Sequence, residues 1–183
     1  FLKIHDNKLY SCNGIGWDFR QEASILIYDI ENDTWTTFSN EGIADKLGIR
    51  YQDVMSVDID PRDLRHVVAG TQAGLFEFYN GELTRHWNDE NSPIYYHYNI
   101  PKPDKNYEVV SSVLFDKDGN LWVANTGSTK STLLKLTADN TWAIPGNAIS
   151  AENSDYLKFM GFDNKGSLWI HNNAYGSAAA YRY

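Results

Sequence analysis

The sequence is poor in several features that would point to particular classes of protein. It has one cysteine, Cys12, among 183 residues, which excludes an intrachain disulfide and a zinc site built from cysteines. No apolar run approaches the roughly 18 residues that a membrane-spanning helix needs, so we expect no membrane insertion by this segment. Lys and Arg number 16 against 24 Asp and Glu, for a formal net charge of −8. This charge balance argues against nucleic acid as a partner and against an anionic membrane surface.

Sequence motifs of common enzyme classes are also missing. We find no G-x-S-x-G elbow, no H-E-x-x-H pair and no G-x-x-x-x-G-K-[ST] phosphate loop. The five histidines are scattered, so no metal-ligand spacing emerges from His5, His66, His86, His97 and His171. We therefore expect no catalytic residue, no metal and no cofactor, with a catalytic role for His97 as the minor alternative.

Aromatic residues, in contrast, are abundant. They make up 14% of the chain, with 12 Tyr, 8 Phe and 6 Trp. Hydrophobic residues account for 42% and charged residues for 22%, which is typical of a folded globular domain. Because aromatic rings favour pleated, half-buried surfaces, this composition indicates β-sheet rather than a helical bundle.

A unit with the order apolar, turn, apolar recurs along the chain. Its clearest copies span 113–123 and 159–170, and their Trp122 and Trp169 are 47 residues apart. A weaker copy spans 57–68 with a longer turn, and there Val67 takes the Trp position. Another copy spans 4–10. Four copies at 47 to 57 residues correspond to the period of a propeller blade.

Each period also contains a second hairpin of alternating apolar residues. The expected strand pairs are 25–28 with 34–38, 74–78 with 83–87, and 133–136 with 142–144. Their turns carry Asp, Asn and Gly, the residues that favour tight turns. In the third copy we expect strands near 109–115, 121–125, 132–136 and 140–144. Four antiparallel strands per period predict propeller blades.

We therefore predict an all-β chain that forms a portion of a β-propeller of about four blades, each a four-stranded antiparallel meander. The whole chain, 1–183, is expected to be a single propeller segment with blades near 1–40, 53–90, 109–146 and 156–183. The first and fourth copies are short, so we expect the propeller to be truncated at both ends. Blades cover their apolar faces by packing on neighbours, so we expect a second chain or further blades to cover the open edges.

The residues around the two Trp copies resemble a known repeat. Phe115 to Trp122 and Phe162 to Trp169 share a strand, a D-x-x-G turn and a Leu-Trp pair. This pattern resembles the two-component regulator propeller repeats of periplasmic sensor domains. A closer likeness is to the propeller of PorZ-type proteins of type IX secretion, in the stretches 54–61, 74–93 and 115–141.

The resemblance implies a β-propeller that recognises a ligand without catalysis. Such sensor domains bind extracellular glycans or other signals, and the secretion proteins act at the cell surface of gram-negative bacteria. By this resemblance the expected location is the periplasm or the cell surface. The expected partners are a glycan or other extracellular ligand, or proteins of a secretion system or of the cell surface.

The conspicuous turn and strand residues have two interpretations each. Asp116, Asp118 and Asn120 surround Gly119 as in a calcium loop, but no distal bidentate Glu sits at the required offset. The simpler interpretation is a tight hairpin in which Asp accepts backbone hydrogen bonds. Trp122 and Trp169 have the chemistry of sugar-stacking platforms, yet their equivalent places inside strands favour a role in the core between blades.

The loops that follow second strands, together with the links between blades, are better candidates for a site, because a meander gathers them at one end of the propeller. They combine flat rings with amides and charges, as a carbohydrate or peptide surface would. The predicted ligand-binding residues are Trp17, Asp18, Arg20, Tyr95, Tyr96, His97, Tyr98, Lys130 and Tyr175.

Other interpretations of these loop residues remain open. Tyr95 to Tyr98 can fold back over a blade edge, and Arg20 and Lys130 can be ordinary solvated charges. The alternative function is a carbohydrate-active propeller enzyme, a glycoside hydrolase or lyase, which would need a cluster such as Tyr95, His97 and Asp18 on the loop face.

Overall fold

The computed structural model describes residues 1–14, 21–100, 104–146, 149–155, 157–173 and 179–183, and their regular secondary structure is almost entirely β-strand. The strands make four antiparallel sheets, each of which pairs strands in sequence order. We call these sheets blades 1 to 4. Three of them have four strands and blade 4 has three within the described residues. The predicted all-β propeller fold is confirmed.

The strands fall close to the places that the sequence predicts. Blade 1 contains β1 (Leu2–His5), β2 (Lys8–Cys12), β3 (Ile25–Asp29) and β4 (Thr34–Thr37). Blade 2 contains β5 (Ser56–Ile59), β6 (His66–Thr71), β7 (Gly74–Tyr79) and β8 (Glu82–Trp87). Blade 3 contains β9 (Val110–Phe115), β10 (Leu121–Asn125), β11 (Leu133–Leu136) and β12 (Trp142–Ala143). Blade 4 contains β13 (Leu157–Phe162), β14 (Leu168–Asn172) and β15 (Ala179–Arg182).

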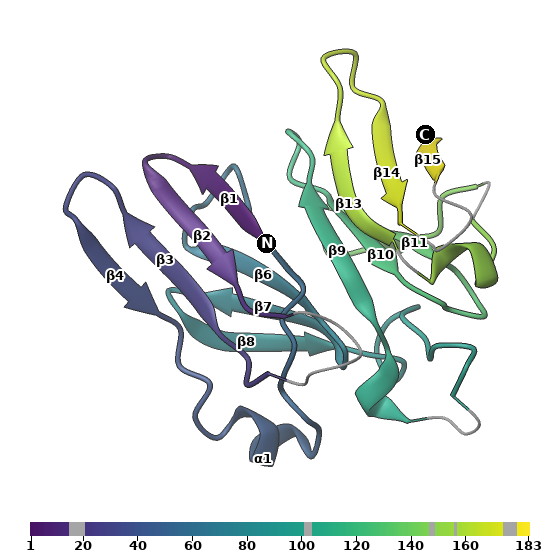
Figure 1. The fold of residues 1–183 in the computed structure, drawn as a ribbon, viewed down its shortest axis with the longest axis horizontal. Helices are drawn as coiled ribbons and strands as arrows, with labels where there is room; N and C mark the ends of the chain where they lie inside the picture. Colours follow the sequence, from purple (N-terminus) through teal and green to yellow (C-terminus); the bar gives the residue numbers. More distant parts are fainter. Residues whose placement is uncertain (15–20, 101–103, 147–148, 156, 174–178) are drawn as a thin grey trace.

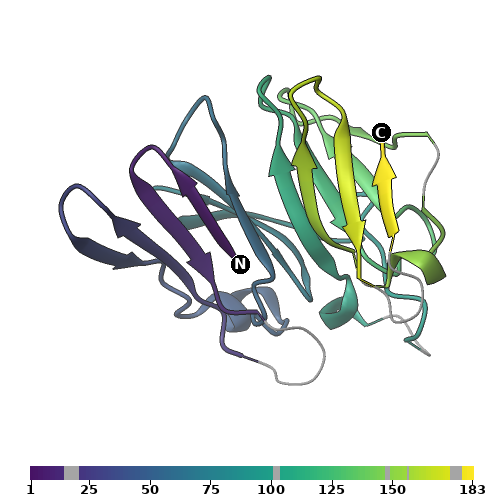
Figure 2. The same ribbon diagram turned by 45° about the horizontal axis from the view of Figure 1, so that its top comes forward.

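The first strand of each blade lies next to the first strand of the following blade. β1 contacts β5, β5 contacts β9, and β9 contacts β13. The later strands fan outward, so that β4 forms the outer edge of blade 1 (Figures 1 and 2). The turns within hairpins lie at one end of the blades, which we call the hairpin end. The segments that join second to third strands and one blade to the next lie at the other, which we call the loop end.

Within the described residues, three short helices that the sequence pattern does not predict lie in the links between blades. They are α1 (Ile43–Leu47) and the 3-10 turns η1 (Lys105–Tyr107) and η2 (Glu152–Ser154). α1 is confined to five residues because Gly42 and Gly48 on either side adopt the left-handed conformation, with φ of 72° and 65°. No helix among the described residues is long and apolar enough to cross a membrane.

The first hairpins of blades 3 and 4 share one turn design. The Asp116 carboxylate accepts hydrogen bonds from the backbone N–H groups of Asp118 and Asn120, at 3.0 and 2.9 Å. Asp163 does the same for Lys165 and Ser167, both at 2.9 Å. These carboxylates therefore close hairpins, as the simpler interpretation predicts, and within the described chain no group of His, Cys, Asp and Glu side chains could hold a metal ion.

Each pair of neighbouring blades encloses its own apolar core. Blades 1 and 2 bury Tyr10, Ile25, Phe76 and Phe78, and blades 2 and 3 bury Leu75 and several Val and Leu side chains of β9 to β11. Blades 3 and 4 bury Leu133, Leu157, Leu168 and Ile170, with Trp122 packed against them. Cys12 belongs to the first core, where burial raises the pKa of its thiol to about 11. Blades 2 and 3 thus bury apolar side chains on both of their faces.

The repeated Trp residues occupy equivalent places in their sheets. Trp122 and Trp169 donate their indole N–H groups to Asp116 and Asp163, at 3.3 and 3.0 Å. Trp122 packs between blades 3 and 4, with its ring centroid 6.3 Å from that of Phe162. Trp169 lies on the face of blade 4 that is turned away from blade 3 and stays 42% exposed. The Trp position predicted to lie in the core is therefore covered in blade 3, where blade 4 packs on it, and is partly exposed in blade 4.

The prediction that Val67 takes the Trp position in blade 2 is wrong. The backbone N–H of Asp60 donates to the carbonyl of His66, as that of Asp116 donates to Asn120, so the residue matching Trp122 is Val68. Val68 accordingly packs toward blade 3, whereas Val67 packs toward blade 1. The turn 60–65 is two residues longer than its counterpart, and this insertion shifted the sequence alignment by one position.

Candidate recognition surface

Two links between blades and one turn meet at the loop end of blades 3 and 4. The side chain of Asn125, at the end of β10, accepts the N–H of Tyr95 at 2.8 Å and donates to its carbonyl at 3.1 Å. Further along both segments, the N–H of Tyr98 donates to the carbonyl of Gly127, and His97 forms an isolated β-bridge with Ser128. The segment 94–100 is thereby fixed against the turn that follows β10.

His97 is the buried centre of this arrangement, with 3% of its side chain exposed. Its Nε2 lies 2.9 Å from Asp155, and its Nδ1 lies 3.2 Å from the backbone N–H of Asn99, which donates to it. Burial lowers the pKa of His97, and the nearby Asp155 carboxylate opposes this only in part. We conclude that His97 is neutral at pH 7 and carries its proton on Nε2, toward Asp155.

Gly127 makes room for this histidine. It has a φ of +64°, and a Cβ built on it would lie 2.1 Å from Cδ2 of His97. Its N–H donates to the side chain of Ser154 at 2.9 Å, which connects the turn to η2. Only glycine satisfies both the left-handed backbone and the close approach of the imidazole.

The three neighbouring tyrosines are half-buried and each has a partner. The Tyr98 hydroxyl donates to Asp155 at 2.5 Å, and its ring stacks on His97. The Tyr96 hydroxyl donates to Asp89 at 2.5 Å, which raises its pKa. Lys130 places its ammonium 3.6 Å from the centroid of the Tyr95 ring. Tyr95, Tyr96, Tyr98 and Lys130 therefore form a strip of three aromatic rings and one cation at the loop end.

Further residues support this strip, although sequence reasoning missed them. Glu108 is fully buried, and its carboxylate accepts the N–H of Asp89 at 2.9 Å. Asn106 accepts the N–H of Arg50, whose guanidinium lies over the ring of Tyr107. These contacts join positions up to 56 residues apart, and no local motif signals them.

The structure therefore brings five of the nine predicted site residues together at one end. These are Tyr95, Tyr96, His97, Tyr98 and Lys130. The other four, Trp17, Asp18, Arg20 and Tyr175, lie outside the described residues. The tyrosines pack as the alternative interpretation expects, while part of each ring stays accessible. That these residues bind a ligand stays a prediction.

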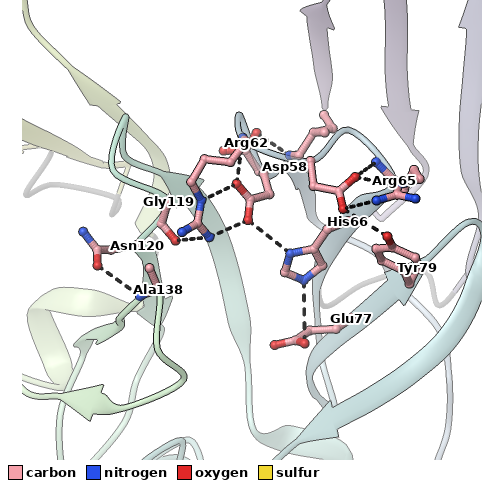
Figure 3. A network of polar contacts seen from close by, with 12 residues as sticks. Asp58, Arg62, Arg65, His66, Glu77, Tyr79, Gly119, Asn120 and Ala138 are labelled. Atoms are coloured by element: carbon pink, nitrogen blue, oxygen red, sulfur yellow. Dashed lines mark hydrogen bonds and ion pairs between the residues drawn. The ribbon is translucent and has the colours of Figure 1, made fainter.

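The hairpin end holds a different kind of polar cluster, between blades 1, 2 and 3. Asp58 is 1% exposed; it pairs with Lys3 of blade 1 and accepts the N–H of Phe115 of blade 3 at 2.7 Å. Arg62 forms a bidentate pair with Asp60, at 3.0 and 2.7 Å, and donates to the Gly119 carbonyl at 3.3 Å. Figure 3 shows Arg62 reaching from its own turn to blade 3. The cluster thus connects the inner strands of three blades.

His66 links two buried carboxylates in the same cluster. Its Nδ1 lies 3.4 Å from Asp60 and its Nε2 lies 3.6 Å from Glu77 (Figure 3). The interaction with the Glu77 carboxylate raises the pKa of His66 despite its burial. Burial would raise the pKa of Glu77, but His66 and the Trp87 indole, which donates at 2.5 Å, outweigh it and lower that pKa. When His66 is protonated, each of the buried carboxylates Asp58, Asp60 and Glu77 has a cationic partner.

Two cavities open at this end of the blades. One of about 220 Å³ lies beside Asp60, His66 and Glu77, between blades 2 and 3. The other, of about 510 Å³, lies between blades 1 and 2, and we call it the blade 1–2 cavity. Its walls are Tyr10, Ile27, Phe38 and Val67, with polar residues at its mouth.

The repeated antiparallel sheets, joined through their inner strands and packed face to face, define the chain as a run of β-propeller blades. Residues 104–127 match the family described as "Two component regulator propeller". The matched residues cover η1 and the first hairpin of blade 3 up to Gly127. The resemblance seen in the sequence is confirmed over this part of the chain.

Solved structures with the same fold cover almost the whole chain. PorZ, an essential bacterial surface component of the type-IX secretion system of Porphyromonas gingivalis, is 19% identical over 98% of this chain and 24% of its own, with a TM-score of 0.78. The extracellular domain of the one component system BT4673 from B. thetaiotaomicron is 14% identical over 98% of this chain and 21% of its own, with a TM-score of 0.56. At these identities the likeness concerns the fold.

This chain therefore spans about a quarter or less of the length of the solved structures that it matches. No curated protein sequence matches it.

Proposed function

We propose that this chain is part of a non-catalytic recognition propeller that works in the periplasm or at the cell surface of a gram-negative bacterium. Support for the location and the type of role comes from the solved structures of similar fold, which are a surface component of a secretion system and extracellular domains of sensor systems. Their function comes to this chain as a proposal, because the shared feature is the fold.

The single observation that carries the proposal is the rigid strip at the loop end. The rings of Tyr95, Tyr96 and Tyr98 are half-buried and each residue is anchored by a hydrogen bond, and the Lys130 ammonium lies over the Tyr95 ring. Rings suit the apolar face of a sugar or side chain, while amides and a cation suit its polar groups. Since the strip is held in place before any ligand arrives, little conformational entropy is lost on binding.

The same geometry favours recognition over catalysis. Both imidazole nitrogens of His97 face groups of the protein, and the ring is almost completely buried. A general base must reach the proton that it removes from a substrate. His97 instead holds the segment 94–100 in position for binding.

Titration calorimetry with a panel of neutral and acidic oligosaccharides tests this proposal. We expect binding to at least one of them, lost in Tyr95→Ala and weakened in Lys130→Ala. Lys117→Ala, an exposed lysine in a hairpin turn, is the matched control and should bind like wild type. Equal affinity in all four proteins would overturn the proposed surface. Turnover of any oligosaccharide that disappears in His97→Ala would overturn the non-catalytic role.

The two roles within recognition differ in the partner. In a sensor the loop end would bind a small extracellular ligand, and in a secretion component it would bind a protein of the surface machinery. Binding of free oligosaccharides supports the first role. Cross-linking of Lys130 to a surface protein in intact cells, reduced in Tyr95→Ala, supports the second.

A further inference from the structure

The outer edge strand of blade 1 differs from the outer strands of the other blades. β4 has the sequence Thr-Trp-Thr-Thr, carries no charge, and all four of its residues are exposed. β8 contains Glu82 and Arg85, β15 contains Arg182, and β12 has two residues followed closely by Pro145. Charges, prolines and short strands are the usual protection of a sheet edge against pairing with another chain. β4 is short, but it carries neither a charge nor a proline.

The outward backbone groups of β4 can be identified from its register with β3. Thr36 lies opposite Ile27, and the N–H of Phe38 donates to the carbonyl of Ile25 at 3.1 Å. In an antiparallel pair these hydrogen-bonded positions alternate with positions whose N–H and C=O groups point away. Trp35 and Thr37 are therefore the residues that offer backbone donors and acceptors along the free edge. Figures 1 and 2 show β4 at the outer margin of the molecule, with β3 on its inner side and no strand on its outer side.

The blade 1–2 cavity runs alongside this edge. Thr36, Thr37, Phe38 and Ser39 contribute to its wall, together with Asn80, Gly81 and Glu82 of the β7–β8 turn. Ile27 packs toward blade 2, and Thr36 is its partner on the neighbouring strand. Because paired residues share a face of the sheet, the Thr36 side chain points to the cavity side. A strand added beside β4 would place the side chain opposite Thr36 next to this cavity.

Charge indicates which end of an antiparallel added strand should be basic. The β3–β4 turn next to Thr34 carries the exposed acidic residues Glu31 and Asp33. A strand antiparallel to β4 would end near this turn. A basic residue at its carboxyl end would therefore face these carboxylates, whereas a parallel strand would bring its amino end there.

We propose that β4 is a docking site for an extended segment of a partner protein, which adds a fifth, antiparallel strand to blade 1. The segment has a large apolar residue that enters the blade 1–2 cavity and basic residues at its carboxyl end. Backbone hydrogen bonds to Trp35 and Thr37 supply the general affinity, and the cavity supplies selectivity, as in other cases of strand addition. This surface is separate from the loop end, so the proposal stands apart from the function given above.

A labelled peptide of sequence TVTFTVKR tests the proposal by fluorescence anisotropy against the whole chain. Its Phe is designed to lie opposite Thr36 and its basic residues next to the β3–β4 turn. We expect saturable binding and slower amide hydrogen exchange at Trp35 and Thr37. A peptide with Ala in place of Phe should bind more weakly, and one with Pro in place of the Thr that follows Phe, which lies opposite Trp35, should not bind. No binding at about 1 mM, the level of the weakest specific complexes, overturns the proposal.

Two substitutions of Thr37 test whether the peptide binds through the backbone of the β4 edge. Thr37→Pro removes an outward donor that β3 does not use, whereas Thr37→Val keeps it. We expect Thr37→Pro to lose roughly tenfold or more in affinity, since one backbone hydrogen bond is lost and its partner is left unsatisfied, and Thr37→Val to bind like wild type. Equal binding by both variants overturns the edge site.

A third variant does not alter the edge backbone. Thr36→Trp fills the cavity and should remove the preference for the Phe peptide over the Ala peptide. If that preference persists, the cavity is not the binding pocket and the proposal fails. Protection of Trp35 and Thr37 without peptide, with a mass that rises with concentration, would identify a second copy of this chain as the occupant and would also overturn it.

Discussion

At the hairpin end the blades are connected by paired charges, whereas at the loop end they are connected by hydrogen bonds around one buried imidazole. Asp58, Asp60 and Arg62 join blades 1, 2 and 3 through a turn design that recurs in part along the chain. Asn125, Gly127 and His97 join loops that occur once. The difference teaches that the repeated turns build the scaffold, while the other end is assembled from loops that each occur once.

Substitution of Gly127 should disturb the loop end most. Gly127→Ala places a Cβ within 2.1 Å of His97 at a φ of +64°, so we expect a loss of about 3 to 4 kcal/mol in the free energy of unfolding. Urea denaturation followed by fluorescence measures it. Gly146→Ala, where nothing lies within 4 Å of the added atom, is the control and should change little. Equal effects of the two would mean that the loop end does not depend on the close contact.

The corresponding test of the hairpin end is removal of Asp58. Asp58→Ala leaves the Lys3 ammonium without its carboxylate and the buried N–H of Phe115 without an acceptor. We expect a loss of about 3 kcal/mol by urea denaturation. Asp118→Ala, an exposed aspartate in a turn, serves for comparison. A loss of less than about 1 kcal/mol, typical of surface pairs, would argue against a connection of three blades.

The two repeated tryptophans provide an internal comparison of covered and uncovered faces. Trp122→Ala should cost about 2 kcal/mol because the ring packs on blade 4, and Trp169→Ala about 0.5 kcal/mol because its ring is 42% exposed. Thermal unfolding of both variants measures this. Similar losses would show that the two faces are covered alike in solution.

The smallest expected effect is on the pH dependence of stability, which should have opposite signs at the two ends. The raised pKa of His66 gives stability that is present below pH 6.5 and lost as pH rises through the folded-state pKa. The lowered pKa of His97 acts in the opposite sense, so stability is lost as pH falls below 6.5.

Denaturation curves from pH 5 to 8 for two variants test these signs. His66→Gln should flatten the decline on the alkaline side, and His97→Gln should flatten the decline on the acid side. If either variant changes the opposite side, the assignment of that histidine is wrong.

The hairpin end could be predicted from the sequence because its determinants are local. An Asp that caps a turn, a Gly with positive φ and a Trp six residues after the Asp lie within one repeat, so the strands of blade 3 agree with the prediction to within two residues. The prediction failed at Val67 because an insertion in the turn 60–65 changed the spacing. The hydrogen bond from Asp60 to His66 corrects it.

The loop end could be predicted only in outline. The rule that a meander gathers certain loops at one end brought Tyr95 and Lys130 together correctly. It did not reveal Asp155, Glu108 or Asn106, because their contacts depend on how the links fold in space. Residues that stabilise a loop from another blade have no fixed sequence offset, so a single sequence does not expose them.

Alkylation of Cys12 can be used to follow the separation of blade 1 from blade 2. It is the single thiol of the chain, and its high pKa together with its burial protects it from alkylating reagents while the first two blades stay together. The rate at which it becomes labelled therefore reports how often these blades come apart. The same label can be followed in a mixture or in a cell extract, where conventional unfolding signals are lost.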